Sequence, residues 1–198
     1  KCNFRCKTCN ITERHAIELS VEEWDKIFKN YKSKIIWATI SGGEPFLRKD
    51  LFFIVKSLYD NCHPKIINIP TNGYLTDQIV ETVKQISQYC RKTHIVINVS
   101  IDELEEKQDE IRGVKGAFKN ACETINRLKF LNAKNVSIGI HTVVSKFNVD
   151  RIPEIYWYLK SMGPDSIISE IAEKRVELKT MDSDITPTVE SYKKVADF

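Results

Sequence analysis

The chain alternates short apolar runs with longer amphipathic runs, and this alternation limits the possible folds more than any other feature. Five strand-like runs cover 35–40, 66–69, 94–100, 136–144 and 166–171. Helical patterns follow them at about 49–61, 77–89, 117–131 and 149–162, and from Thr186-Pro187 onward, where the proline is expected at the first helical position. Strands that alternate with helices favour parallel strands joined by right-handed crossovers. The sequence therefore predicts an α/β fold, either an open or a closed barrel.

A further helix is predicted before the first strand. Ser20-Val-Glu-Glu23 has the pattern of a capping box, and the helical pattern after it continues to about Tyr31. The 198 residues are 42% hydrophobic and 29% charged, which is ordinary for a globular protein, and no linker or repeat divides them. We therefore expect one domain over 1–198, with a flexible loop at about 172–186 that includes a charged connection.

Charge and hydropathy restrict the partners and the compartment. A net charge of +3 is too small to argue for a nucleic-acid partner. No apolar run approaches the length that a membrane segment needs, so none is expected. No secretory signal is visible, although the chain begins so abruptly that an upstream segment could precede it. These features favour a reduced, cytoplasmic setting.

One face of the predicted strands carries polar groups. Ordinary parallel sheets are apolar on both faces. Here the apolar residues of three strands alternate with Asn68, Asn98, Ser100, Gly139 and His141. If the apolar faces pack on the helices, these five residues line the interior and form a cavity for a polar ligand. Each of them alone could equally be an ordinary core residue with satisfied hydrogen bonds, so the argument depends on the agreement of the three strands.

Turn motifs follow the same strands. Ser41-Gly-Gly-Glu-Pro45, Pro70-Thr-Asn-Gly73 and Ser100-Ile-Asp102 come after the first three runs. Barrel enzymes place their chemistry at the C-terminal ends of the strands. Paired glycines let the backbone approach a ligand closely, and a glutamate accepts hydrogen bonds from a cationic amine. Each motif alone is only turn chemistry, but together they predict a site on one rim.

Three cysteines near the start of the chain predict a metal centre. Cys2, Cys6 and Cys9 stand in the segment Cys-Asn-Phe-Arg-Cys-Lys-Thr-Cys. Cysteine thiolates are the usual ligands of iron–sulfur clusters, so three of them on one loop can hold three irons of a [4Fe–4S] cluster. The remaining iron would lack a protein ligand. Such an open position lets a substrate or cofactor bind the metal directly.

Zinc and disulfides are the alternatives for these cysteines. Structural zinc needs four ligands, and the fourth would have to be His15, Cys62, Cys90 or Cys122. A disulfide framework is disfavoured because the six cysteines split into one tight group and three scattered residues. The scattered cysteines lie in or near apolar helical stretches, where they are most simply interpreted as small buried hydrophobic residues.

The order of these motifs resembles the radical S-adenosylmethionine superfamily. The match runs over essentially the whole chain: Cys-x3-Cys-x2-Cys, Gly-Gly-Glu-Pro, Thr-Asn-Gly, Ser-x-Asp, and a strand ending Thr-Val-Val. The flanking residues are similar to the branch of molybdenum-cofactor cyclases, peptide maturases and their SPASM-domain relatives. The resemblance implies a partial (β/α)6 TIM-like barrel of parallel strands. Compared with these relatives, we expect this chain to be without the first strand and without a C-terminal extension that carries auxiliary-cluster cysteines. Thr8 stands where relatives usually carry an aromatic residue.

The resemblance also implies a role for individual residues. Cys2, Cys6 and Cys9 would ligate the cluster, and S-adenosyl-L-methionine would chelate its open iron. The expected cofactor contacts are Gly42, Gly43 and Glu44 to the methionine amino group, Thr71 and Asn72 on the adjoining rim, Ser100 and Arg112 to ribose and carboxylate, and Val143 and Ile168 beside the adenine. Without the family, Arg112 could equally be a solvated residue of the charged stretch 103–112. Substrate contacts are expected from Asn68, Asn98 and His141.

The implied activity is that of a radical S-adenosylmethionine enzyme. An electron from the cluster would cleave the sulfonium to methionine and a 5′-deoxyadenosyl radical, which abstracts hydrogen from an unidentified substrate. A peptide or protein is slightly favoured over a small metabolite, a nucleotide or a lipid headgroup. No catalytic side chain is expected beyond the cluster and cofactor residues, and the electron would come from a donor such as a reduced flavodoxin or ferredoxin. A zinc-stabilised binding module and a catalytically silent barrel fragment are the competing interpretations.

Overall fold

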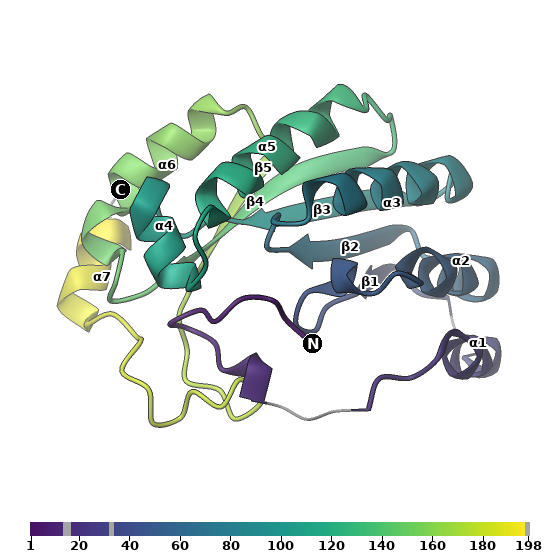
Figure 1. The fold of residues 1–198 in the computed structure, drawn as a ribbon, viewed down its shortest axis with the longest axis horizontal. Helices are drawn as coiled ribbons and strands as arrows, with labels where there is room; N and C mark the ends of the chain where they lie inside the picture. Colours follow the sequence, from purple (N-terminus) through teal and green to yellow (C-terminus); the bar gives the residue numbers. More distant parts are fainter. Residues whose placement is uncertain (14–16, 32–33, 197–198) are drawn as a thin grey trace.

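The five strands form one sheet in which every neighbouring pair is parallel. A computed structural model describes residues 1–13, 17–31 and 34–196. The sheet order follows the sequence: β1 (Trp37–Thr39), β2 (Ile66–Thr71), β3 (His94–Ser100), β4 (Val136–Val144) and β5 (Ser166–Ile171). The sheet curls into a half-barrel (Figure 1). The predicted α/β fold with a partial barrel is therefore confirmed.

Helices cover the convex face of this sheet (Figure 1). They are α1 (Val21–Asn30), α2 (Leu51–Cys62), α3 (Thr76–Tyr89), α4 (Glu105–Arg112), α5 (Ala117–Phe130), α6 (Ile152–Ser161) and α7 (Val189–Ala196), with the short 3-10 turns η1 (Ile11–Glu13), η2 (Pro45–Leu47) and η3 (Val149–Arg151). The predicted capping box is present at α1, because Ser20 and Glu23 each accept a hydrogen bond from the other's backbone N–H. Within the described residues, none of the helices is both long and apolar enough to span a bilayer.

Two helices differ from the sequence prediction. Helix α4 lies within the charged stretch 103–112, for which no helix was predicted. Helix α7 begins at Val189 and not at Pro187. The Thr188 hydroxyl accepts the backbone N–H of Ser191 at 3.1 Å, and the Thr188 carbonyl accepts that of Tyr192. Thr188 is thus the N-cap, which places Pro187 one residue before the N-cap and two before the first helical residue.

The core lies between the sheet and its helices. Ile67, Ile95, Ile97 and Ile140 are fully buried on the helix-facing side, together with residues from α2, α3, α5 and α6. Burying an aliphatic side chain of this size stabilises a fold by about 1.5–3 kcal/mol. The opposite, concave face carries the polar residues, as the alternation predicted. This division leaves the inside of the half-barrel free for a ligand.

The segment after β5 returns to the start of the chain. Asn10 donates its backbone N–H to Leu178 O at 3.0 Å and its side-chain amide to Lys179 O at 2.8 Å. Thr180 and Ile185 in the same segment are buried. The flexibility expected for 172–186 stays a prediction, but these contacts show that the segment forms one wall beside the cysteines.

Candidate active site

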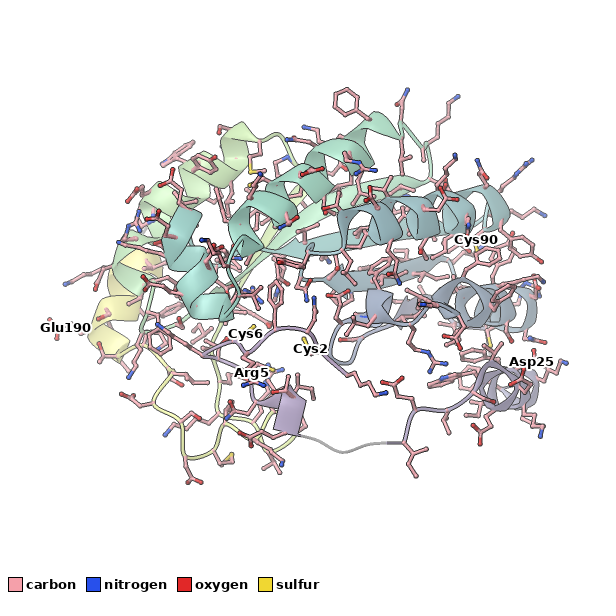
Figure 2. All side chains as sticks on the ribbon, viewed as in Figure 1. Cys2, Arg5, Cys6, Asp25, Cys90 and Glu190 are labelled. Atoms are coloured by element: carbon pink, nitrogen blue, oxygen red, sulfur yellow. The ribbon has the colours of Figure 1, made fainter. Side chains whose placement is uncertain are left out.

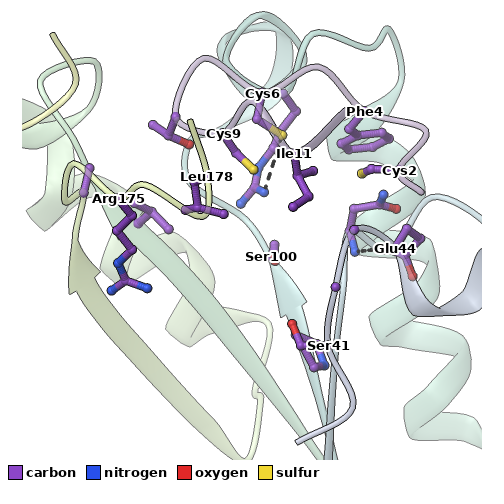
Figure 3. A pocket seen from close by; sticks show the side chains of 18 of the residues that line it. Cys2, Phe4, Cys6, Cys9, Ile11, Ser41, Glu44, Ser100, Arg175 and Leu178 are labelled. Carbon is purple, nitrogen blue, oxygen red and sulfur yellow. Dashed lines mark hydrogen bonds between the residues drawn. The ribbon is translucent and has the colours of Figure 1, made fainter. Parts of the chain in front are cut away.

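A cavity of about 190 Å³ opens at the C-terminal edge of the sheet. All three N-terminal cysteines line it, and Figure 3 shows them on one loop that lies opposite Ser100 and Glu44. The other predicted cofactor residues on its wall are Gly42, Gly43, Thr71, Asn72, Arg112 and Val143. The motifs that follow separate strands therefore meet at one site, as parallel topology requires.

The loop that carries the cysteines is held against the end of α4. Arg5 N donates to Arg112 O at 3.3 Å, and Lys7 N donates to Ile111 O at 2.8 Å. Gly113 caps this helix with φ +68°, and a Cβ there would lie 2.4 Å from Arg5 O. A glycine is thus required for both the backbone conformation and the close approach. These contacts fix the cysteines over the cavity.

The cysteine donor set fits an iron–sulfur cluster better than a single metal ion. Among the described residues, no three His, Cys, Asp or Glu side chains are grouped as ligands of one ion would be. A [4Fe–4S] cluster does not need that convergence, because each thiolate binds a different iron. Burial raises the pKa of the Cys6 thiol to about 11, and the nearby Arg112 opposes this rise. Ligation requires the thiolate, so binding of a cluster would release protons here.

The three scattered cysteines, which were proposed as alternative zinc ligands, are not at this site. Cys62 and Cys90 are buried in the hydrophobic core, and Cys122 is half-buried against it. None of these three lines the cavity. Their interpretation as small core residues is confirmed. His15 lies outside the described residues.

Glu44 joins the first two turn motifs. Its Oε1 accepts hydrogen bonds from the Thr71 hydroxyl at 2.8 Å and from Phe46 N at 3.1 Å, and its Oε2 accepts Asn72 N at 2.7 Å. Burial raises the pKa of this carboxyl, and the hydrogen bonds oppose the rise. A carboxylate offers about four acceptor positions, so these three donors leave room for a cationic amine.

The two glycines before Glu44 have different spatial requirements. A Cβ on Gly43 would lie 2.0 Å from the carbonyl oxygen of Lys1, which accepts the N–H of Glu44 at 2.9 Å. Gly42 has φ +155°, and a Cβ there would meet nothing within 4 Å. Gly43 therefore packs the turn against the cysteine loop, whereas Gly42 leaves free space at the cavity wall.

Arg112 is buried with part of its hydrogen-bonding capacity unused. It is 9% exposed, so the alternative of a solvated arginine is wrong. Its Nη2 lies 2.8 Å from Asp102 Oδ1 and its Nη1 lies 3.9 Å from Cys6 Sγ. The Nη2 contact is an ion pair without hydrogen-bond alignment, since both Nε and Nη2 lack an aligned acceptor. A buried guanidinium with free N–H groups at a cavity wall is suited to an anion such as a carboxylate.

Gln108 shapes the third turn, and sequence reasoning missed it. Its Oε1 accepts Asp102 N at 2.9 Å and Glu103 N at 3.1 Å, while its Nε2 donates to Ser100 O at 3.2 Å. Gln108 is only 1% exposed. A single polar residue in a charged stretch carries no local signal of such burial. The motif Ser100-Ile-Asp102 did indicate Asp102, although no cofactor role was predicted for it.

Some predicted residues lie on the concave face but not on the cavity wall. Ile168 is 45% exposed on β5, and the wall is formed instead by the end of that strand, including Glu170 and Ile171. Asn98 donates to Asn68 Oδ1 at 2.8 Å, and His141 Nε2 lies 3.5 Å from Glu170 Oε1. Their roles toward adenine and substrate stay predictions.

Further wall residues were not predicted. They are Phe4, Thr8 and Ile11 from the cysteine segment, and Glu173, Arg175 and Leu178 from the segment after β5. Phe4 is 2% exposed and packs edge-on against Tyr74 at 5.5 Å between ring centroids. Its position between two cysteines was a usable signal, whereas only the fold brings Arg175 and Leu178 to the site.

Curated proteins with similar sequences are longer than this chain. A probable GTP 3′,8-cyclase of Methanococcus maripaludis strain C5 is 28% identical over 201 residues, which cover 100% of this chain and 64% of that protein. The sporulation killing factor maturation protein SkfB of Bacillus subtilis is 26% identical over 161 residues, which cover 78% of this chain and 36% of that protein. The chain thus spans less than two thirds of these relatives.

Solved structures share the fold. SuiB of Streptococcus suis bound to S-adenosylmethionine superposes with a TM-score of 0.73 at 16% identity, over 99% of this chain and 44% of that one. Native anSMEcpe with bound AdoMet superposes with a TM-score of 0.71 at 18% identity, over 87% of this chain and 49% of that one. The family model of the radical SAM superfamily matches residues 1–159. The chain belongs to the radical SAM superfamily, whose members are enzymes that use a [4Fe–4S] cluster and S-adenosylmethionine.

Proposed function

We propose that Cys2, Cys6 and Cys9 hold a [4Fe–4S] cluster, that S-adenosylmethionine binds in the adjoining cavity, and that the protein is a radical S-adenosylmethionine enzyme. One observation carries the proposal. Three cysteines from one loop, the Gly-Gly-Glu turn and a buried arginine with unused N–H groups border the same cavity. Membership of the superfamily supports the same assignment.

In this proposal each predicted cofactor residue has a defined task. Gly42, Gly43 and the remaining acceptor position of Glu44 bind the methionine amino group, and Thr71 and Asn72 keep Glu44 in place. The carboxylate and ribose are held by Arg112 and Ser100, and the adenine by Val143 and Ile168. When bound, the cluster and S-adenosylmethionine supply an electron and a 5′-deoxyadenosyl radical for hydrogen abstraction. The protein orients these groups and shields them from water.

The substrate is proposed only by class. Asn68, Asn98 and His141 present polar groups on the concave face, where a substrate would reach the cofactor. A peptide or protein is slightly favoured because SkfB is a maturation protein and SuiB has been solved with a precursor peptide. Because other relatives are probable GTP 3′,8-cyclases, a nucleotide is the second candidate class of substrate. Superfamily enzymes need an electron donor; here we propose a reduced flavodoxin or ferredoxin in the cytoplasm.

Metal analysis of anaerobically reconstituted protein tests this proposal. We expect about four irons and four sulfides per chain, as the cluster formula requires. Adding S-adenosylmethionine should change the electron paramagnetic resonance spectrum of the reduced cluster, because the cofactor binds the open iron. A colourless protein with zinc and no iron would identify a zinc-stabilised binding module. A cluster whose electron paramagnetic resonance spectrum does not change when S-adenosylmethionine is added would identify a catalytically silent barrel fragment.

A further inference from the structure

We propose that the outer side of the cysteine loop is the docking surface for an acidic one-electron carrier protein, with Arg5 and Lys7 as its main contacts. The inference rests on the proposed function, because a cluster must be present to receive the electron. The step is a transfer of one electron, in which the carrier is oxidised and the cluster reduced, and no bond is made or broken. We call Arg5, Lys7, Lys146 and Phe147 the basic patch.

The position of the basic patch follows from the loop itself. Arg5 and Lys7 flank Cys6 in the sequence, and both are exposed, whereas Cys6 is partly buried and lines the cavity. Figure 2 shows Arg5 and Cys6 on the same loop. A carrier that contacts these two side chains therefore touches the residues directly next to Cys6, a proposed cluster ligand. Neither Arg5 nor Lys7 lines the cavity proposed for S-adenosylmethionine, so docking on their side chains leaves that cavity free.

The charges of Arg5 and Lys7, two members of the basic patch, are not neutralised within the described part of the chain. Neither Arg5 nor Lys7 forms an ion pair with another described residue. No acidic residue occurs before Glu13 in the sequence. Lys146 pairs with Asp184 at 2.5 Å, but that contact is at the surface and water screens it. The outer side of the loop therefore presents positive charge to solvent.

An exposed aromatic ring adds an apolar contact. Phe147 is 36% exposed, with Lys7 Nζ 5.4 Å and Lys146 Nζ 5.3 Å from its ring centroid. These cation–π contacts bring the two ammonium groups together at the edge of the cysteine loop. An apolar centre within a charged rim is typical of protein–protein contact surfaces. The combination distinguishes the basic patch from a charged surface that only keeps the chain in solution.

The backbone beneath the basic patch is already ordered. Arg5 N and Lys7 N are both hydrogen-bonded to the last turn of α4, and Gly113 packs against Arg5 O. A partner would not have to order this loop on binding, which lowers the entropic cost of association. Complementary charge accelerates encounters by about 10–1,000-fold. Fast, salt-sensitive association suits a carrier that must deliver an electron and leave.

Charge reversal with two reductants tests the proposal. The reconstituted protein, R5E, K7E and the double variant would be reduced anaerobically either by reduced flavodoxin, a carrier with an acidic surface, or by dithionite. Lys84→Glu is the matched control, because Lys84 is exposed on α3, away from the cysteine loop. Stopped-flow absorbance measures cluster reduction, and interferometry with oxidised flavodoxin measures binding. Iron content is measured for every variant.

We expect the double variant to be reduced by flavodoxin at least about tenfold more slowly at low salt, with weaker binding and unchanged iron and dithionite reduction. Lys84→Glu should match the wild type. An unchanged flavodoxin rate in the double variant would overturn the docking surface, and so would equal losses with both reductants. Wild-type protein that never assembles a cluster would instead refute the proposed function, so the two failures are distinguishable.

Discussion

Arg112 Nη2 lies 2.8 Å from Asp102 Oδ1, and both side chains are almost fully buried beside the cysteine loop. Asp102 Oδ1 also accepts Val143 N at 2.9 Å, so the same carboxylate joins the ends of β3 and β4 to helix α4. The arginine in turn reaches toward Cys6 Sγ. The contact with Asp102 holds the guanidinium of Arg112 at the cavity wall.

Replacing Asp102 with asparagine should destabilise the protein strongly. Removing one partner of a buried pair leaves an uncompensated charge, which costs about 3–5 kcal/mol. Urea unfolding of the metal-free protein measures the change. Asp184→Asn is the control, because its pair with Lys146 is solvent-exposed and should matter much less. If both variants lost a similar amount of unfolding free energy, the Asp102–Arg112 pair would have no special structural role.

Gly43→Ala should impair assembly of the cluster. The added methyl would lie 2.0 Å from Lys1 O, so the cysteine loop must move away from the Gly-Gly-Glu turn. Overpacking of this kind costs about 1–3 kcal/mol. Iron and sulfide content after reconstitution are the readouts.

Gly42→Ala is the matched comparison for Gly43→Ala. The φ of Gly42, unlike that of Gly43, disfavours alanine, but a Cβ on Gly42 touches nothing within 4 Å. We expect it to keep its iron and to bind S-adenosylmethionine more weakly, because the methyl enters the cavity wall. Full iron content in Gly43→Ala would contradict the close contact between the turn and the loop.

Asp50 should make a pH-dependent contribution to stability. Arg48 donates from Nε and Nη2 to its two oxygens at 2.9 and 2.8 Å, which lowers the pKa of Asp50 from 3.8. Because the folded pKa lies below the unfolded value, the stabilisation is complete above 3.8 and disappears as pH falls through the folded pKa. The effect is modest because the pair is partly exposed.

The difference in urea midpoint between wild type and Asp50→Asn measures this contribution. It should be constant from pH 7 to about 5 and shrink toward zero in more acidic solution. A difference that stays constant down to pH 3, or grows, would show that the pair does not perturb Asp50 as described.

Periodicity predicted the sheet well because strands and helices repeat their burial pattern locally. The bounds of β3, β4 and β5 match the predicted runs, and the predicted polar residues Asn98, Ser100 and His141 do lie on the concave face. Helix α4 was not predicted, because its sequence Glu-Glu-Lys-Gln-Asp-Glu-Ile-Arg is almost entirely polar and shows no apolar periodicity. Only Gln108, Ile111 and Arg112 are buried in it.

The residues of the site also fall into those that local sequence patterns predicted and those that they did not. Cys2, Cys6, Cys9 and the turn motifs were recognisable because their chemistry is local and strand topology brings their ends to one edge. Gln108, Arg175 and Leu178 were not, because their places depend on long-range contacts without any sequence periodicity. The ion pair between Asp102 and Arg112 is likewise a tertiary contact, across ten residues and a helix that sequence patterns did not indicate.

Formation of 5′-deoxyadenosine tests the central claim most directly. Reconstituted protein, dithionite and S-adenosylmethionine are incubated without oxygen, and the nucleoside is quantified by chromatography, with Cys6→Ala as the comparison. We predict that wild-type protein forms 5′-deoxyadenosine and methionine in equal amounts and that Cys6→Ala forms neither. Equal nucleoside formation by both proteins, or none by a wild-type protein with a full cluster, would contradict the account.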